Sequence, residues 1–275
     1  HIKGRVKGAI SLGSCLFENG LFQKEQINFV TDNAAWAIHV MTTSLCGGLN
    51  NAHPGSARVI TDPRFLRNKL IHFGTRDLWL RWQNNVHPSN KIVVTCLHGS
   101  AKDGPQFAES LNNFVKTAPG LSAIVTSTRK MEQRLIDFGI PSGIIHRIPL
   151  GVDCGLFKPP KSGERIDARK QLSIPDGLCC IGSFQKDGTG WGEGLEPKLI
   201  KGPDIFVETV IRINRKKPVF CLLTGPARGY VINRLKENGI PFAHHFVSRY
   251  EDIVKFYYAL DLYIISSREE GGPLA

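Results

Sequence analysis

Short apolar runs alternate with helix-like stretches along most of this chain, and this alternation constrains the fold more than any other feature of the sequence. The first six runs are four to seven residues long and rich in β-branched residues, which favours strands. They lie at 27–30, 57–60, 70–73, 91–97, 122–126 and 144–148. Between them we expect helices over 34–45, 105–116 and 129–138. Strands and helices in such alternation form a parallel sheet covered on both faces, so the sequence predicts an α/β fold.

The alternation stops at a stretch rich in Pro and Lys and then starts again. Residues 158–163 read Lys-Pro-Pro-Lys-Ser-Gly, a composition typical of a linker. Beyond it we expect strands at 178–181, 219–223, 242–246 and 262–265, and helices at 203–215, 230–237 and 250–260. The sequence therefore predicts two doubly wound domains, 1–157 and 158–275. The second has fewer strands than such a domain usually has, so we expect it to be incomplete.

The chain is basic, with 35 Lys and Arg against 24 Asp and Glu. A basic surface favours anionic partners, or it simply aids solubility. No run of five basic residues and no nucleic-acid-binding motif occurs, so we expect no nucleic-acid partner. The segment from Ile2 to Lys7 and the side chains of Arg64, Arg67 and Lys69 are candidates for contact with an anionic membrane, with a solvated basic face as the alternative.

Cysteine usage and hydropathy indicate a reducing compartment and no membrane span. The seven cysteines form no C-x-x-C pair, and several lie in apolar runs, which is typical of buried free thiols. Their spacing fits no zinc site, so we expect no metal. No apolar stretch approaches 18 residues and no signal peptide is visible. We expect a cytoplasmic protein, with peripheral contact at the inner membrane face as a possibility.

Three segments stand out together. The first is Ile148-Pro149-Leu150-Gly151-Val152-Asp153, followed by Phe157-Lys158-Pro159; the second is Lys201-Gly202-Pro203-Asp204; the third runs from Ser266 to Leu274 and contains Glu270-Gly271-Gly272-Pro273. In order and spacing they resemble the motifs of glycosyltransferase family 4, the retaining glycosyltransferases of GT-B fold. The resemblance covers the chain from about Ile27 to Ala275.

This resemblance implies two Rossmann-like domains that face a cleft, with the acceptor on the first and a nucleotide-diphosphate-sugar on the second. It implies a metal-independent retaining transfer of the sugar to a carbohydrate or lipid-linked acceptor, in which the acceptor hydroxyl attacks on the face that the diphosphate leaves. No cofactor beyond the donor substrate is implied. By the same resemblance Glu270 lies beside the donor sugar, and a second Glu would follow at position 278, past the end of the sequence.

Physical chemistry supports an anion site in the second domain. Helix N-termini with nearby glycines present free N–H groups to phosphates, and Lys201 with Gly202 precedes an expected helix. Gly271, Gly272, Pro273 and Leu274 follow the last strand, where we expect backbone amides against a phosphate and Pro273 at a helix start. The alternative for Lys201 is a solvated lysine at the start of a helix.

The sequence departs from the family after the first strand of the second domain. The family usually has an Arg there that grips the diphosphate, and Ser183 stands roughly in its place. A glycine-rich segment, 185–200, follows; it is a candidate phosphate cradle or lid, with a plain surface insertion as the alternative. Its Lys186 or Lys198 could supply the missing charge, although lysine lacks the bidentate fork of arginine.

Two further positions follow from the resemblance. His98 comes after the strand at 91–97, where a His-Gly pair of the family faces the donor sugar; a histidine packed at a sheet edge is the alternative. Gly225 and Arg228 follow another strand of the second domain, in a neighbourhood that passes close to the nucleotide. Arg228 either touches base or phosphate or caps its own loop.

Two other functional classes remain open. The departure at Ser183 favours a non-catalytic GT-B scaffold that binds a sugar nucleotide without turnover. A GT-B sugar-nucleotide epimerase would need acidic catalytic residues in the first domain, and no clear set is visible.

Overall fold

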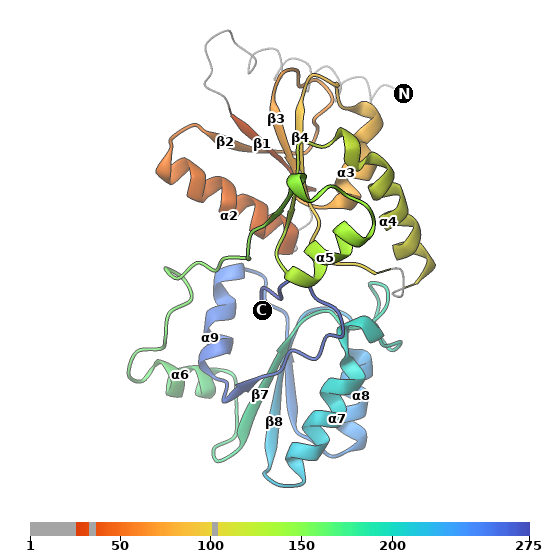
Figure 1. The fold of residues 1–275 in the computed structure, drawn as a ribbon. Coiled ribbons are helices and arrows are strands. Elements are labelled where there is room, and N and C mark those ends of the chain that lie inside the picture. The colour runs from red at the N-terminus through yellow and green to blue at the C-terminus, as the bar shows by residue number, and fades with distance from the viewer. Residues whose placement is uncertain (1–25, 33–36, 101–103) are drawn as a thin grey trace, which may run out of the picture. The chain divides into compact units, whose positions relative to one another are not determined.

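The computed structural model describes residues 26–32, 37–100 and 104–275 of the chain (Figure 1). The chain divides into two compact units, His1–Leu150 and Gly151–Ala275, which we call unit 1 and unit 2. This division lies a little before the domain boundary that the sequence predicts after Phe157. The basic segment from Ile2 to Lys7 and the start of the helix expected at 34–45 lie outside the described residues.

Unit 1 is built on a six-stranded parallel sheet with the order β2-β1-β3-β4-β5-β6. Its strands are β1 (Ile27–Val30), β2 (Ala57–Ile60), β3 (Leu70–Phe73), β4 (Lys91–Thr95), β5 (Ala123–Thr126) and β6 (Ile145–Arg147). Its helices are α2 (Ala37–Ala52), α3 (Arg76–Trp82), α4 (Pro105–Thr117) and α5 (Arg129–Asp137). All six strands expected from the apolar runs are present.

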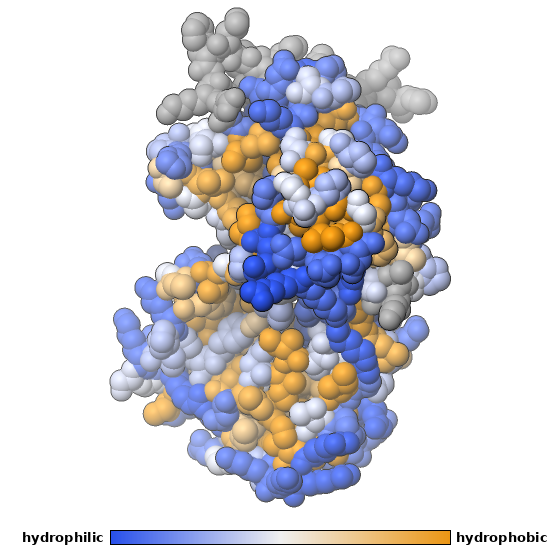
Figure 2. Space-filling view, in the orientation of Figure 1, coloured by the Kyte–Doolittle hydropathy of each residue, from blue (hydrophilic) through white to orange (hydrophobic). Residues whose placement is uncertain are grey.

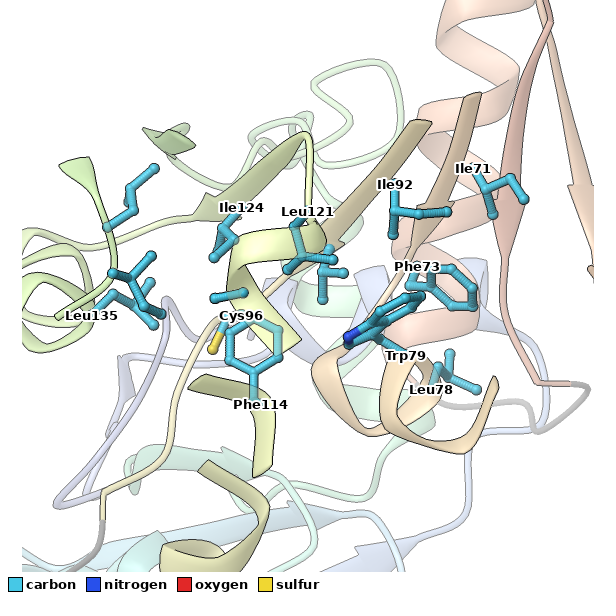
Figure 3. Close-up of a cluster of buried hydrophobic side chains, with 14 of the residues drawn as sticks. Ile71, Phe73, Leu78, Trp79, Ile92, Cys96, Phe114, Leu121, Ile124 and Leu135 are labelled. Atoms are coloured by element: carbon cyan, nitrogen blue, oxygen red, sulfur yellow. The ribbon is translucent and has the colours of Figure 1, made fainter. Parts of the chain in front are cut away.

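Helices cover both faces of this sheet. Figure 1 shows α2 on one side of the sheet and α3 and α4 on the other. Side chains of α3, α4 and α5 pack with the strands into one buried cluster, in which Phe73, Trp79 and Phe114 are the largest (Figure 3). Burial of this apolar surface is the main source of stability for such a layer.

Unit 2 has a four-stranded parallel sheet with the order β10-β7-β8-β9. Its strands are β7 (Cys179–Phe184), β8 (Val219–Thr224), β9 (Phe242–His245) and β10 (Leu262–Tyr263). Its helices are α6 (Glu164–Gln171), α7 (Pro203–Asn214), α8 (Gly229–Glu237) and α9 (Ile253–Tyr258). One buried cluster joins α7 and α8 to one face of the sheet, and a second joins α6 and α9 to the other face.

Two helices, α3 and α6, are absent from the sequence-based prediction. Helix α3 begins where the Thr75 hydroxyl accepts a hydrogen bond from the Leu78 N–H, with Asp77 in the first turn and Arg81 in the last. Helix α6 follows the Pro- and Lys-rich stretch directly, has few apolar residues, and adds arginine contacts to the burial of Ala168 and Leu172. Arg169 and Arg165 both donate to the Asp261 carboxylate.

Candidate functional site

Three loops of unit 2 meet at the carboxyl edge of its sheet. They are residues 185–202 between β7 and α7, residues 225–228 between β8 and α8, and residues 264–275 after β10. Since β10 and β8 are the two neighbours of β7, their carboxyl ends are brought together around the end of β7. Loops at this edge form the ligand site in open α/β sheets.

Lys201 and Glu270 form an ion pair at this edge. Lys201 Nζ lies 2.6 Å from Glu270 Oε1, and the Ser267 hydroxyl donates to the same carboxylate oxygen at 2.8 Å. Both side chains are partly exposed, at 28% for Lys201 and 20% for Glu270. Two positions that are 69 residues apart in the sequence thus form one polar group open to solvent.

The backbone around Lys201 is fixed by its neighbours. The side chains of Gln185 and Ser266 each donate to the Lys201 carbonyl at 3.2 Å. Gly202 has φ of 63°, and a Cβ built on it would lie 1.9 Å from the Ser266 carbonyl oxygen. Only glycine fits this close approach in a left-handed conformation, which explains why Gly must follow the lysine.

The glycine-rich segment after β7 folds into a hairpin over residues 187–198. Gly188 bridges to Pro197, the Thr189 N–H donates to the Glu196 carbonyl, and the Lys198 N–H donates to the Asp187 carbonyl at 2.7 Å. The Lys198 N–H donates to the Asp187 carbonyl, and Asp187 directly follows Lys186 in the sequence. The two lysines therefore lie at the two ends of the hairpin. We call this segment the 187–198 hairpin.

Lys198 lies within electrostatic reach of both Lys186 and Lys201. The pKa of Lys198 is lowered, first by burial of its ammonium and then by the charges of Lys201 and Lys186, while the Glu270 carboxylate opposes the shift. Three ammonium groups and one carboxylate give a local charge of 3 − 1 = +2. Such a concentration of cations around a single carboxylate is the electrostatic signature of an anion site. We call these four residues the lysine cluster.

Trp191 lies in the hairpin and is 70% exposed. The ammonium of Lys186 stands 3.6 Å from the centroid of its ring, which is a cation–π contact. Leu195 and Leu199 of the same loop are also exposed. Figure 2 shows that apolar and hydrophilic residues are interspersed over the visible surface, and exposed apolar side chains are ordinary on such a surface.

Arg228 and Ser183 are buried and contact each other. Arg228 is 1% exposed, donates to the carbonyls of Ser183, Gln185 and Thr224, and reaches the Ser183 hydroxyl at 3.0 Å. Arg228 thus binds carbonyls at the carboxyl ends of both β7 and β8, and a contact of Arg228 with base or phosphate stays a prediction. Ser183 lies inside β7 with no exposed surface, so it does not line the edge where the family has its arginine.

At the N-termini of α7 and α8, hydrogen bonds within the protein engage first-turn groups, and the phosphate contact expected at the start of α7 stays a prediction. The first-turn amides of α8, at Gly229 and Tyr230, donate to the Glu193 and Gly194 carbonyls of the hairpin. At α7 the Asp204 carboxylate takes two hydrogen bonds from Arg268. These bonds, and those from nearby backbone N–H groups of the first turn, lower the pKa of Asp204. Cationic side chains supply positive charge at the same edge.

Residues 271–275 have no regular structure. A helix beginning at Pro273 stays a prediction, because 273–275 is shorter than one helical turn. Gly271 is buried, Gly272 has φ of 101°, and Leu274 is 39% exposed. Gly225 has φ of 92° and packs against the Gln185 carbonyl, so it brings the loop after β8 close to the loop after β7.

His98 belongs to unit 1, in the loop after β4, and its side chain is exposed. Two arginines hold the backbone of this loop. Buried Arg76 donates to the His98 carbonyl at 2.7 Å, and Arg134 donates to the Gly99 carbonyl at 2.6 Å. The carboxyl edge of the sheet of unit 1 therefore has a fixed turn that carries an exposed imidazole. A role of His98 at a donor sugar stays a prediction.

The remaining candidates concern surfaces and metals. Arg64 is paired with Asp62, and Arg67 donates to the Arg64 and Leu66 carbonyls, so internal contacts engage two of the basic side chains considered for a membrane surface. Among the described residues, no group of three or more His, Cys, Asp or Glu is placed to hold a metal ion. In the same part of the chain, every helix is too short or too polar to cross a bilayer.

Two parallel-sheet α/β units in one chain are the architecture of the GT-B fold, and solved structures confirm this fold. The chain resembles HepE of Anabaena, solved in complex with UDP and glucose, with a TM-score of 0.65 and 15% sequence identity over 89% of this chain and 74% of that chain. No family model and no curated protein sequence matches the chain.

Two enzymes are similar at the same level. Sucrose-phosphate synthase from Thermosynechococcus elongatus gives a TM-score of 0.65 at 15% identity, over 89% of this chain and 76% of that chain. WaaG, a glycosyltransferase involved in lipopolysaccharide biosynthesis, gives 0.61 at 12% identity, over 88% and 75%. At these identities the likeness establishes the fold, and the chemistry has to be argued from the site.

Proposed function

We propose that this chain is a retaining glycosyltransferase that binds a nucleotide-diphosphate-sugar at the carboxyl edge of unit 2 and transfers the sugar to a carbohydrate or lipid-linked acceptor. The lysine cluster carries this proposal. Its charge of +2 complements the two negative phosphates of such a donor. The structures of HepE with UDP and with UDP-glucose support the choice of uridine donors as the first to test.

The roles of the residues follow from their positions. Lys201, Lys198 and Lys186 contact the diphosphate and stabilise the negative charge that grows on it as the sugar leaves. Ser267 orients Glu270, and Glu270 meets the sugar. His98 is a further candidate for contact with the sugar, as the resemblance to the family implies. Acceptor and departing diphosphate share one face of the sugar, the diphosphate takes the proton of the acceptor hydroxyl, and no metal ion is needed because lysines provide the charge.

The first experiment is calorimetric binding of UDP, GDP and ADP, followed by slow hydrolysis of UDP-glucose monitored by proton NMR. We expect UDP to bind and the first anomer released to be α-glucose, both without added metal ion and in the presence of EDTA. The variant Lys201→Ala should weaken UDP binding by about 2 kcal/mol, whereas Lys217→Ala, which removes an exposed lysine at the amino end of β8, should not.

The outcomes separate the proposal from its alternative. Absence of binding by all nucleotides would contradict a donor site. Release of β-glucose first would contradict retention. Binding without hydrolysis or transfer to any acceptor would favour the non-catalytic scaffold, a reading that the absence of an arginine at the end of β7 supports.

A further inference from the structure

We infer that Arg228 is a positioning residue, which fixes the 187–198 hairpin so that Lys186 and Lys198 face the anion, and that it does this without touching the ligand. The inference rests on the proposed donor site and assigns a role to a residue that has no exposed surface at that site. Its basis is the set of contacts that join Arg228, the two strand ends and the hairpin.

Arg228 ties the ends of two strands together. Its Nη1 lies 2.7 Å from the Ser183 carbonyl, 2.9 Å from the Gln185 carbonyl and 2.8 Å from the Thr224 carbonyl. These oxygens belong to the second-last residue of β7, the last residue of β8 and the first residue of the loop that carries Lys186. Nη2 and Nε of the same guanidinium reach the Ser183 hydroxyl and the Asp187 carboxylate, a spread of contacts that the single ammonium of lysine cannot match in geometry.

Arg228 also contacts Asp187, the first residue of the hairpin. Its Nε lies 3.0 Å from the Asp187 Oδ1, and both side chains are fully buried. Burial raises the pKa of Asp187 to about 6 and lowers the pKa of Arg228, while each charge opposes the shift of the other. Asp187 follows Lys186 in the sequence, and its carbonyl accepts a hydrogen bond from the Lys198 N–H. The position of Asp187 therefore sets the backbone positions of both lysines.

The hairpin packs closely against the loop that contains Arg228. A Cβ at Gly188 would lie 2.4 Å from the Ala227 carbonyl oxygen, and one at Gly194 would lie 2.2 Å from the same atom. Gly192 of the same hairpin has open space around it. The hairpin therefore packs directly against Ala227, the residue before Arg228. Its outer part, around Gly192, has no such close contact.

The structure offers two matched pairs of variants. Arg228→Lys keeps the charge and removes the fork at the carboxyl end of β7. Its control is Arg169→Lys, because Arg169 donates to the Leu178 carbonyl and to Asp261 at the amino end of the same strand. Gly188→Ala displaces the hairpin from Ala227 without altering Arg228. Gly192→Ala is its control, because a Cβ there meets open space.

The test measures calorimetric binding of inorganic pyrophosphate at several salt concentrations, with hydrogen exchange of residues 187–198 and urea unfolding to verify the fold. We expect Arg228→Lys and Gly188→Ala to bind pyrophosphate about tenfold more weakly, because a loosened supporting shell misplaces both lysines. Their affinity should also depend less steeply on salt, since fewer cations meet the ligand, and their hairpin amides should exchange faster. Both controls should keep wild-type affinity and salt dependence even where they lower stability.

The outcomes distinguish the inference from the function on which it rests. If the wild type fails to bind pyrophosphate at low salt, the proposed donor site is wrong. If the wild type binds and Arg228→Lys keeps the same affinity and salt dependence, the positioning role is wrong. Should Arg228→Lys fail to fold, the comparison of Gly188→Ala with Gly192→Ala decides, and equal affinities in that pair would overturn the inference.

Discussion

At the scale of single residues, Glu270 decides how strongly the lysine cluster attracts an anion. Its carboxylate lies 2.6 Å from the Lys201 ammonium, so an incoming phosphate competes with it for that ammonium. The same carboxylate is proposed to meet the donor sugar. A residue with these two tasks has opposite effects on binding of an anion alone and on reaction of a sugar donor.

The variant Glu270→Gln separates the two tasks. We expect pyrophosphate to bind several-fold more tightly, because removal of one negative charge raises the local charge from +2 to about +3. Hydrolysis of UDP-glucose should fall by at least about tenfold, because the carboxylate at the sugar is lost. Calorimetry and a nucleotide-release assay check the two effects. Glu237→Gln, which makes the same charge change at the exposed carboxyl end of α8, should show neither effect, and weaker pyrophosphate binding by Glu270→Gln would contradict the assignment.

His72 gives unit 1 a dependence on pH that is independent of any ligand. It lies in β3, contacts the Thr95 hydroxyl at 2.8 Å, and burial lowers its pKa to about 4. Between the unfolded pKa of about 6.5 and the folded value, the unfolded chain binds more protons, so stability is lost as the pH falls. We expect the free energy of unfolding to drop by about 2 kcal/mol between about pH 6.5 and 4.5 from this group. Urea unfolding of His72→Gln should lack this part of the loss, and an equal loss in both proteins would contradict it.

At the scale of secondary-structure elements, the start of α7 depends on how closely it approaches the loop after β10. Gly202 meets the Ser266 carbonyl, and Arg268 reaches back to Asp204 and to the Leu199 carbonyl. These contacts fix the first turn of α7 against the loop that follows β10. The ion pair of Lys201 with Glu270 depends on the same approach.

Gly202→Ala should break this approach. The variant has a strained left-handed residue and a clash with the Ser266 carbonyl, and we expect it to lower the free energy of unfolding by about 2–3 kcal/mol. Gly177→Ala is the control, because Gly177 has φ of 77° with open space around it and experiences the strain alone, which costs about 1 kcal/mol. Urea unfolding of both variants tests the difference, and equal losses would mean that the contact with Ser266 does not matter.

The strands of both units could be predicted from the sequence because each lies in a short, largely apolar run between turn residues. Helix α6 could not, since it has few apolar residues and its stability depends on Arg165 and Arg169 reaching Asp261, more than 90 residues away. In the site, the resemblance to a family singled out Lys201 and Glu270, but their contact depends on β10 lying beside β7. The pairing of Arg228 with Asp187 had no signal in the sequence, because nothing local shows that two charged residues in glycine-rich loops are buried.

At the scale of the whole molecule, the two units have separate buried cores. The clusters around Phe73 and Phe29 contain residues of unit 1 alone, and the clusters around Phe184 and Phe206 contain residues of unit 2 alone. Cooperative unfolding follows contiguous cores, so each unit is expected to have its own transition.

Scanning calorimetry should therefore show two thermal transitions. Pyrophosphate should raise the Tm of one of them only, because a ligand stabilises the unit that binds it. Arg169→Lys, a change in unit 2, should lower the Tm of the same transition and leave the other in place. A single transition that pyrophosphate and Arg169→Lys both shift would show that the chain unfolds as one cooperative unit.

The lowered pKa of Lys198 has a consequence for protons. Burial and two neighbouring ammonium groups make the charged form of Lys198 costly, and a bound anion relieves that cost. At a pH alkaline enough to deprotonate part of Lys198, anion binding must therefore draw protons from the buffer, and the apparent heat of binding must vary with the ionisation enthalpy of that buffer. By reciprocity, a lower pH strengthens anion binding, and a bound anion strengthens proton binding by Lys198.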